Sequence, residues 1–571
     1  MNLRKIYYKK TGRTFLTIVR SYREKGRKNP TAVTVRSLGY LDVLEKEFPD
    51  PIAHFEKVVE EMNKAEKETE QPNNITFYKN ELSTGKEHLQ KNLGYAALSK
   101  IYHELGLRMF LTNHTRNLKA EFNLNNILKI LSFSRILEPC SKKRTYENRE
   151  WFFENTDFSL DDVYRSLSVL NMLKDDILLH IHKKIKEQYN RSTELVYYDV
   201  TNYYFEIDEQ DSLRKKGVSK EHRPNPIVQM GLFMDTKGVP LCYRLFEGNT
   251  NDCKTLIPIL RDLKRDYDIG RTIVVADKGM NTADNIISLL LNRDGYIYSQ
   301  TVRGAHKELK EYILDKKDYQ WVNDDFKVKS RLYPRLISFK DKDGKKKSIR
   351  IDEKQVVFYN KDFDKKAKAD RAATVIKAQD LVVNPSKYKQ AISHGAAKYV
   401  ENLNYDKDTG EIIVVGNQPM FDEEKLKEEE KYDGYYCIIT SEYKKTDQEI
   451  IDLYHGLWKI EESFKVTKSD LKARPVYLSR EDHIEAHFLI CFIALTIARL
   501  LENRLDNKYS ITKIAESLKK MTCINEGQNW YLLLYHDEIT EIISEKMGID
   551  MKHRRLTLGQ IKNFLGATKK T

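Results

Sequence analysis

Cysteine is rare in this chain, and its six positions form no recognisable pattern. No two cysteines stand as a Cys-x-x-Cys pair, so the sequence favours neither a zinc module nor a disulfide framework. This usage is typical of a reducing cytoplasm. Met1–Tyr8 lacks the apolar segment of a signal peptide, and the longest apolar run, residues 488–498, is shorter than the ~20 residues that cross a bilayer. We therefore expect a cytoplasmic protein with no membrane partner.

Acidic residues are outnumbered by basic ones, 85 against 98, and the isoelectric point is near 9.0. A positive surplus is typical of proteins with a polyanionic partner, above all nucleic acid. A lysine-rich protein with well-solvated surfaces has the same composition, so charge alone leaves both interpretations open. Hydrophobic residues make up 40% of the chain, which is enough for buried cores, and 571 residues predict several domains.

The N-terminal third of the chain changes character twice. Residues 4–40 alternate like strands, with turn signals at 11–13 and 25–27, and predict a small β-meander. The next segment has helical spacing, high charge and a linker composition. From about residue 93 to 192 the periodicity is helical throughout. A packing module with solvated charges is one interpretation of this helical region. The other is a DNA-binding domain, which its basic residues favour: Lys129, Arg135, Lys142, Lys143 and Arg144.

The segment after residue 193 alternates strands and helices. Residues 194–205 form a strand rich in β-branched and aromatic residues, and 227–246 form a hairpin around Asp235–Gly238. A helix, a short apolar strand at 271–277, a second helix and a strand at 295–300 follow. Three leading strands and then alternating helices and strands is the order of a ribonuclease-H-like core.

A lysine-rich stretch with hairpin signals at Asp343-Gly344 and Asp408–Gly410 separates this core from its last elements. We therefore predict an α/β multidomain protein whose ribonuclease-H-like core is interrupted by a β-rich insertion and followed by a helical C-terminal region. The predicted units are a β-meander at 1–41, a charged helix and linker at 42–92, a helical DNA-binding domain at 93–192, the first segment of the core at 193–302, the insertion at 303–433, the second segment of the core at 434–505, and a helical region at 506–571 that is a candidate for dimerisation.

Two carboxylates stand where strands should be apolar. Asp199 lies within Val196–Val200, and Asp277 ends the run Ile273–Ala276. A buried ionised carboxylate needs a cation or hydrogen bonds, and a satisfied strand-end aspartate is the ordinary explanation for either one alone. The first and fourth strands of a ribonuclease-H-like core are neighbours, so the two side chains should converge. Paired carboxylates with a third acid suit two Mg²⁺ ions, which take oxygen ligands and promote phosphodiester displacement.

The third acid should come from a later helix, which a capping box at Thr446 and Glu449 opens and which continues to about residue 469. At 100° per residue, Tyr454, Glu461, Lys465 and Lys468 form a row beside an apolar stripe that includes Leu457. Glu462 falls a further 100° out, toward solvent, so helix geometry selects Glu461. An ordinary surface pair between Glu461 and Lys465 is the alternative.

These motifs together resemble the bacterial DDE insertion-sequence transposases with a Tyr-Arg-Glu-Lys signature. Tyr454, Glu461 and Lys468 match its spacing, and Asp199 in Tyr-Asp-Val-Thr-Asn and Asp277 in Ala-Asp-Lys-Gly match its aspartate motifs. The signature arginine falls at Leu457, where this chain departs from the pattern. The resemblance covers residues 194–500, including the insertion, and the layout of residues 22–39 is also similar.

The resemblance implies cut-and-paste transposition of an insertion sequence, an activity of a DNA nuclease and strand transferase. Asp199, Asp277 and Glu461 would be catalytic and would hold two Mg²⁺ ions, for which Mn²⁺ substitutes. The protein would nick the element's ends, commonly through a hairpin intermediate, and join them to target DNA. Its partners would be double-stranded DNA, namely the terminal inverted repeats and the target, and a second copy in a homodimer, so that it associates with the nucleoid.

The resemblance also implies contacts with DNA outside the acids. Tyr454 and Lys468 would bind phosphates beside the scissile bond, with Lys465 and Arg474 as further candidates and Lys459 or Arg474 as a replacement for the missing arginine. Lys278, Trp321 and the run Lys142, Lys143 and Arg144 are candidate DNA-binding residues. Trp321 lies in the insertion, where the family can use aromatics to hold a flipped base, although strand tryptophans more often pack.

Two other interpretations of the sequence stay open. A catalytically inactive, transposase-derived DNA-binding protein or regulator would keep the fold, and a junction nuclease could share the ribonuclease-H-like core. The three acids favour activity, while the large insertion and the Tyr-x6-Glu-x6-Lys spacing disfavour the junction nuclease. His483 and His487 have the i,i+4 spacing of zinc ligands, but no third ligand accompanies them.

Overall fold

The computed structural model describes residues 1–9, 11–22, 31–68, 90–118, 122–221, 223–340, 343–383, 395–401, 404–405, 412–413, 419–549 and 552–570. The chain divides into two compact units, Met1–Thr84 and Gly85–Thr571. The predicted turn at 25–27 and the hairpin signal at 408–410 lie outside the described residues.

The N-terminal unit contains the three strands that the sequence predicts between residues 4 and 40. They form an antiparallel sheet in the order β1-β2-β3, and Gly12 turns the chain between the first two with a φ of 65°. Two helices belong to the same unit, and Leu16, Leu44 and Phe55 form its core. The elements are β1 (Asn2–Tyr8), β2 (Arg13–Tyr22), β3 (Thr31–Tyr40), α1 (Leu41–Leu44) and α2 (Pro51–Glu68).

A nine-stranded sheet organises the larger unit, in the order β10-β11-β12-β17-β9-β8-β5-β6-β7. Strands β5, β6 and β7 are antiparallel neighbours, and β8 and β9 continue from β5 in parallel. This is the predicted strand order of a ribonuclease-H-like core. Its elements are β5 (Leu195–Tyr204), β6 (Ile227–Asp235), β7 (Pro240–Glu247), α9 (Leu256–Asp266), β8 (Ile273–Ala276), α10 (Ala283–Leu291), β9 (Gly295–Gln300) and β17 (Tyr435–Thr440).

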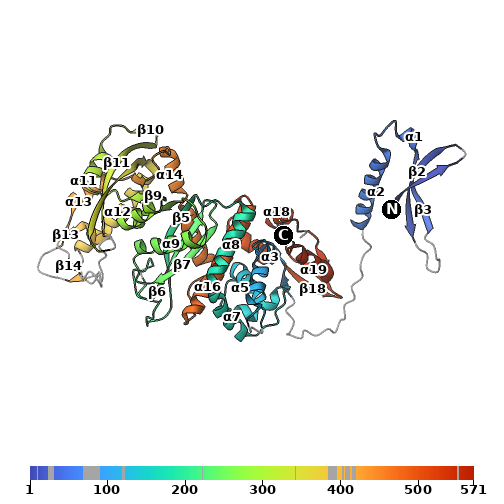
Figure 1. The fold of residues 1–571 in the computed structure, drawn as a ribbon, viewed down its shortest axis with the longest axis horizontal. Coiled ribbons are helices and arrows are strands. Elements are labelled where there is room, and N and C mark those ends of the chain that lie inside the picture. Colours follow the sequence, from blue (N-terminus) through green and yellow to red (C-terminus); the bar gives the residue numbers. More distant parts are fainter. Residues whose placement is uncertain are drawn as a thin grey trace. The chain divides into compact units, whose positions relative to one another are not determined.

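The predicted insertion extends this sheet. Its long hairpin, β11 (Phe326–Lys340) and β12 (Lys346–Asn360), turns at Gly344, and β12 pairs antiparallel with β17 of the core. Figure 1 shows these strands beside α12 and α14. The remaining larger elements of this region are α11 (Lys307–Leu314), β10 (Gln320–Asn323), α12 (Lys361–Val383) and α13 (Glu423–Glu430).

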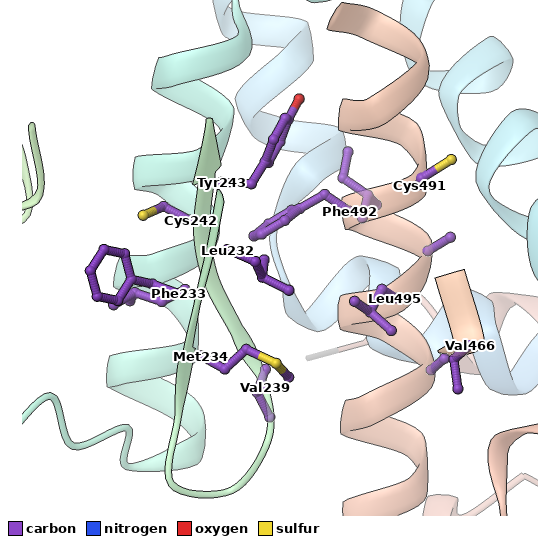
Figure 2. Close-up of a cluster of buried hydrophobic side chains, with 14 of the residues drawn as sticks. Leu232, Phe233, Met234, Val239, Cys242, Tyr243, Val466, Cys491, Phe492 and Leu495 are labelled. Carbon is purple, nitrogen blue, oxygen red and sulfur yellow. The ribbon is translucent and has the colours of Figure 1, made fainter. Parts of the chain in front are cut away.

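Helix α16 (Glu481–Arg504) is the central helix of the helical region. It packs against α3, α5 and α7 and against strand β7, so the helices and the sheet share one core. Figure 2 shows Phe492 and Leu495 of this helix facing Leu232 and Tyr243 of the β6–β7 hairpin. The helix is long and apolar enough to cross a membrane by composition, but most of it is buried inside the protein, as predicted for a core helix. The other helices are α3 (Tyr95–Glu104), α4 (Leu107–Thr115), α5 (Leu124–Leu137), α6 (Lys142–Glu147), α7 (Leu160–Met172) and α8 (Lys174–Tyr189).

Within its described residues, the predicted helical C-terminal region at 506–571 contains three helices, but it also contains three strands that were not predicted. Strands β18, β19 and β20 form a sheet with β4, which precedes the helical region and lies several hundred residues away in the chain. A strand stabilised by such a distant partner carries little local signal, because its hydrogen bonds are non-local. The elements are β4 (Gln90–Asn92), α17 (Ile511–Lys520), β18 (Thr522–Gly527), β19 (Trp530–Leu533), α18 (Glu538–Met547), β20 (Arg555–Thr557) and α19 (Leu558–Ala567).

Candidate active site

Asp199 and Asp277 lie on adjacent parallel strands at matching positions. In the register of β5 and β8, Tyr197 pairs with Val275, and each aspartate follows two residues later. Side chains two residues apart point to the same face of a sheet, so the two carboxylates emerge side by side. The sequence-based expectation that neighbouring strands bring the two aspartates together agrees with this arrangement.

Asp199 is a half-buried carboxylate among other acids. Its Oδ1 accepts a hydrogen bond from the backbone N–H of Val200 at 2.7 Å. Burial raises the pKa of Asp199 to about 6, and the charges of Asp277 and Glu461 act in the same direction, while Lys220 and the Val200 N–H oppose them. The site therefore concentrates negative charge that the protein's own groups only partly neutralise.

Asp277 stands at the exposed end of β8 and is held by two hydroxyl groups. Ser299 Oγ on β9 donates to Asp277 Oδ1 at 2.7 Å, and the Tyr454 hydroxyl donates to the same oxygen at 3.4 Å. Burial raises the pKa of Tyr454, and the neighbouring Asp277 charge adds to this, so the phenol stays protonated as a donor. Tyr454 therefore connects the later helix to the second aspartate.

The predicted single helix from 446 to 469 is divided. The capping box at Thr446 and Glu449 is present, α14 (Asp447–His455) ends at Gly456, α15 (Trp458–Lys465) follows, and a π-helical turn covers Val466–Asp470. A Cβ on Gly456 would overlap the hydroxyl of Tyr197 on β5. The glycine thus permits close approach of the helix to the strand that carries Asp199, and it weakens the helix at that point.

Glu461 and Glu462 differ, but not for the predicted reason. Glu461 is exposed and Glu462 is half-buried, because Glu462 forms an ion pair with the buried Arg499 of α16 at 3.2 Å. The prediction that Glu462 turns to solvent was therefore wrong, since α16 covers that side. Glu461 interacts electrostatically with Asp199 and Tyr454. Among the described residues it makes no salt bridge with Lys465, which is also exposed.

Lys468 lies on the π-helical turn, close to Asp199. Its Nζ is 3.4 Å from Glu221 Oε1 and 5.5 Å from the centre of the Tyr203 ring. Burial lowers the pKa of Lys468 to about 8, Lys220 adds to this effect, and Asp199 opposes it. The row Tyr454, Glu461 and Lys468 thus runs along both aspartates, with Tyr454 at Asp277 and Lys468 toward Asp199.

Glu221 also pairs with Arg474, which is half-buried above the Tyr204 ring. Lys459, proposed with Arg474 as a replacement for the missing arginine, donates instead to the carbonyl oxygen of Thr236 at 2.6 Å. Leu457, at the position of that arginine, is only 5% exposed. Of the two proposed replacements, only Arg474 therefore lies beside Lys468.

Sequence reasoning missed Lys220, a charged residue beside Asp199, and Asp252, an acid next to that lysine. Lys220, from the charged loop after β5, donates to the carbonyl oxygen of Val200 and lies 3.8 Å from Asp252. Asn251 caps the short helix at Asp252–Lys254, and burial raises the pKa of the half-buried Asp252. The run Ser-Lys-Glu at 219–221 was the available signal, and only the folded loop brings it to the site.

The donor chemistry of the acids fits hard divalent cations, which prefer carboxylate oxygens. In the described residues of the chain, however, no three His, Cys, Asp or Glu side chains are close enough to hold one ion together. Burial chiefly raises the pKa of Asp199, the charges of Asp277 and Glu461 add to this, and a bound cation would oppose both effects. The three acids therefore fit a divalent cation by the chemistry of their oxygens, while their arrangement in this structure does not form a site for a single ion bound by all three.

Four of the candidate DNA-binding residues outside the catalytic row lie on the surface. Lys278 is exposed directly after Asp277. Trp321, on β10, is 59% exposed, and Lys327 Nζ lies 5.3 Å from its ring centre. Lys143 is exposed at the start of α6. Arg144, the fourth, is exposed and forms a 3.4 Å ion pair with Glu147.

The remaining three basic residues that the prediction named in the helical region are buried, which corrects the prediction that they form a DNA-binding surface. Lys129 pairs with Glu154, and Arg135 donates to the carbonyl oxygens of Leu471 and Lys472. Lys142 is 6% exposed and bonds to His487. Helical periodicity places such residues on a face, but it does not reveal which face another helix covers.

The histidine pair at 483 and 487 does not form a metal site. His487 Nε2 lies 2.9 Å from the carbonyl oxygen of Ala473, and its Nδ1 lies 3.1 Å from Lys142 Nζ, so both ring nitrogens are engaged. His483 Nε2 lies 3.3 Å from Ser168 Oγ.

Two carboxylates on neighbouring parallel strands and a third on a helix beside them are the layout that the sequence analysis expected of a ribonuclease-H-like catalytic core. The family model of the transposase DDE domain matches residues 208–497, about half of the chain, so the protein is a DDE transposase. The match begins after Asp199, which lies on β5 just before it. The model of the IS1634 family transposase N-terminal domain matches residues 3–73.

Comparisons with other proteins add little beyond the family. No curated protein sequence matches the chain. A cryo-EM structure of the piggyBac transposase synaptic complex with hairpin DNA has 8% identity and a TM-score of 0.32, over 86% of this chain and 87% of that one. The Mos1 transposase paired-end complex with left transposon end has 14% identity and a TM-score of 0.13, over 30% of this chain and 56% of that one.

Proposed function

We propose that this transposase catalyses metal-dependent cleavage of DNA at the terminal inverted repeats of an insertion sequence and joins the freed ends to target DNA. The observation that supports the proposal is the matched register of Asp199 and Asp277, with Glu461 coupled electrostatically to Asp199. In this cut-and-paste reaction we assign Asp199, Asp277 and Glu461 as the catalytic carboxylates. We further propose the hairpin intermediate that is common in this branch of transposases.

Asp199, Asp277 and Glu461 would hold two Mg²⁺ ions, with Mn²⁺ as a substitute. Such ions activate an attacking oxygen and stabilise the leaving one in phosphodiester displacement. The protein contributes by fixing two of the acids, because β5 and β8 are hydrogen-bonded neighbours in one sheet. Asp199 and Asp277 are fixed by the sheet register, and Ser299 and Tyr454 orient the Asp277 carboxylate by hydrogen bonds.

The cationic residues beside the acids suit a DNA backbone. Lys468 and Arg474 both face Glu221, and we propose that phosphates beside the scissile bond compete with this carboxylate for them. Tyr454, at the opposite end of the row from Lys468, donates its hydroxyl hydrogen to the Asp277 carboxylate. Lys465, Lys278 and Trp321 are exposed, and we propose that they contact DNA outside this central row.

Transposition joins two element ends, so we propose a homodimer on double-stranded DNA as the active assembly, with Lys143 and Arg144 as further DNA contacts. The same proposal places the protein in the cytoplasm and, when DNA-bound, on the nucleoid. A catalytically inactive DNA-binding derivative is the competing function, and it predicts end binding without cleavage.

Purified protein with Mg²⁺ and a duplex that carries the element's terminal inverted repeat tests the proposal. We expect cleavage at the repeat boundary by the natural protein and none by Asp199→Asn. Asp208→Asn, an exposed acid on the loop after β5, is the matched control and should cleave normally. Equal cleavage by Asp199→Asn would overturn the assignment of the site, and binding without cleavage by the natural protein would support the inactive derivative.

A further inference from the structure

A small pocket opens between the helical region and the segment that follows the π-helical turn. It has a volume of about 190 Å³. Pockets that hold drug-sized ligands have about 300–1,000 Å³, so this one suits a small polar group. Four cations line it, together with His487 and the exposed Tyr477: Arg135, Lys142, Lys472 and Arg474.

The charges in this pocket have one sign. No acidic residue is among the described residues that line it. Arg135, Lys142 and His487 are each more than nine-tenths buried. A buried charge without a counter-charge is costly, so an anion in the pocket would relieve an existing cost.

Arg135 is the most poorly satisfied of these groups. Its Nη1 donates to the carbonyl oxygens of Leu471 and Lys472 at 3.3 and 3.2 Å. Its buried Nε has no hydrogen-bond partner among the described residues. A guanidinium stays charged at any physiological pH, and its fork of N–H groups matches the oxygens of a phosphate.

The tautomer of His487 determines how many N–H donors of the Lys142 ammonium are used. The Nε2 of His487 faces the carbonyl oxygen of Ala473, which only accepts, so that nitrogen carries the proton. The unprotonated Nδ1 then accepts one hydrogen bond from Lys142 Nζ at 3.1 Å. An ammonium has three donors, so two remain. Burial lowers the pKa of Lys142 to about 7, and Arg135 adds to this, effects that a bound anion would reverse.

We propose that this pocket binds a phosphate group, supplied by the backbone of the transposon DNA through Arg135, Lys142 and Lys472. The assignment of DNA as the source of the phosphate rests on the proposed function, whereas the anion site itself does not. Arg474 lines the pocket and also pairs with Glu221 beside Lys468, so the pocket continues the cationic side of the catalytic row. The exposed Lys472 and Tyr477 at its rim leave it open to a strand outside.

Inorganic phosphate is the first probe. Thermal melts of the full chain without Mg²⁺ compare sodium phosphate with sodium chloride at equal ionic strength. We expect a saturable rise in Tm that is lost in Lys142→Met and retained in Lys183→Met, a variant of an exposed lysine on α8. Because phosphate also stabilises proteins non-specifically, the difference between the variants is the measurement. If Lys142→Met does not fold, Lys472→Asn replaces it. Lys472 is exposed with a φ of 44°, which asparagine tolerates, and its loss should weaken the same response.

DNA is the second probe, with a duplex carrying the element end, in EDTA, at several salt concentrations. We expect the slope of log K against log salt to fall by about one in Lys142→Met and not in Lys183→Met. A phosphate response with an unchanged slope would assign the pocket to free phosphate and overturn the DNA source. No phosphate response in the natural protein would overturn the anion site. Neither measurement depends on cleavage, so a failure of the proposed catalysis would be seen separately.

Discussion

Asp199 and Asp277 each stand two residues beyond a directly paired position, Tyr197 with Val275, on parallel neighbouring strands. Their separation is therefore set by backbone hydrogen bonds and not by flexible side chains. The third acid has no such constraint, because Glu461 lies on a helix whose approach depends on Gly456 and on the packing of α16. Catalysis should consequently be more sensitive to the position of the helix than to that of the strands.

Glu461 and Glu462 are separable by mutation. We expect Glu461→Gln to reduce DNA cleavage by about 10³-fold or more, because it removes one of the three acids proposed to hold the ions. Glu462→Gln keeps an acceptor for Arg499 and should cleave within a few-fold of the natural protein. Single-turnover cleavage of an end duplex measures both. A larger loss in Glu462→Gln than in Glu461→Gln would reverse the assignment.

Stability should depend on pH through Asp199. Its pKa is raised from 3.8 to about 6 in the folded protein. The free energy of unfolding therefore falls as pH rises through this interval, and it stays constant with respect to this group above it. Asp199→Asn removes the ionisation, and its stabilising effect should be about 1 kcal/mol larger at pH 7.5 than at pH 5. Denaturant unfolding at the two pH values measures the difference. Asp208→Asn, a change of an exposed acid, should show none, and an equal effect of Asp199→Asn at both pH values would contradict the elevated pKa.

Mg²⁺ should stabilise the protein without DNA. A cation relieves the repulsion among Asp199, Asp277 and Glu461, so Tm should rise saturably with the concentration of Mg²⁺ or Mn²⁺. Addition of EDTA should bring Tm back to its value without metal. The double variant Asp199→Asn, Asp277→Asn should show no such rise. Sodium chloride at matched ionic strength is the control. An equal rise in the double variant would place the bound metal elsewhere.

Gly456→Ala should disrupt the approach of the third acid. The added methyl group overlaps the hydroxyl of Tyr197, so α14 and α15 must shift away from β5. We expect a loss of about 1–3 kcal/mol in the free energy of unfolding and a larger proportional loss of cleavage. Gly270→Ala has open space around its Cβ and should change neither. Tyr197→Leu, combined with Gly456→Ala, should restore some of the stability, and the absence of any restoration would sink the steric explanation.

Restoring the signature arginine should fail. Leu457 is buried in the main core, so Leu457→Arg places a charge in an apolar environment. We expect about 2–4 kcal/mol of destabilisation and no gain in DNA affinity. Leu457→Met should be nearly neutral. Tighter end binding by a folded Leu457→Arg protein would show that the position faces DNA after all.

The order of the core was accessible from the sequence because strand and helix periodicities are local. The predicted strands at 194–205 and 295–300 and the hairpin at 227–246 match β5, β9 and the β6–β7 pair. The two aspartates could be selected for the same reason, because carboxylates are unusual within apolar strand patterns. The C-terminal sheet could not be predicted, because β18 depends on the distant strand β4 for its hydrogen bonds.

By itself the sequence determined which residues we propose for the chemistry: two aspartates in or directly after apolar strands, and a tyrosine, a glutamate and a lysine at seven-residue spacing. Only the tertiary structure decided what surrounds them. Helix α16 turned Glu462 toward Arg499, the folded loop brought Lys220 to Asp199, and helix packing buried Lys129, Arg135 and Lys142. Periodicity defines the faces of an element, whereas burial depends on which distant element covers each face, and that information is non-local.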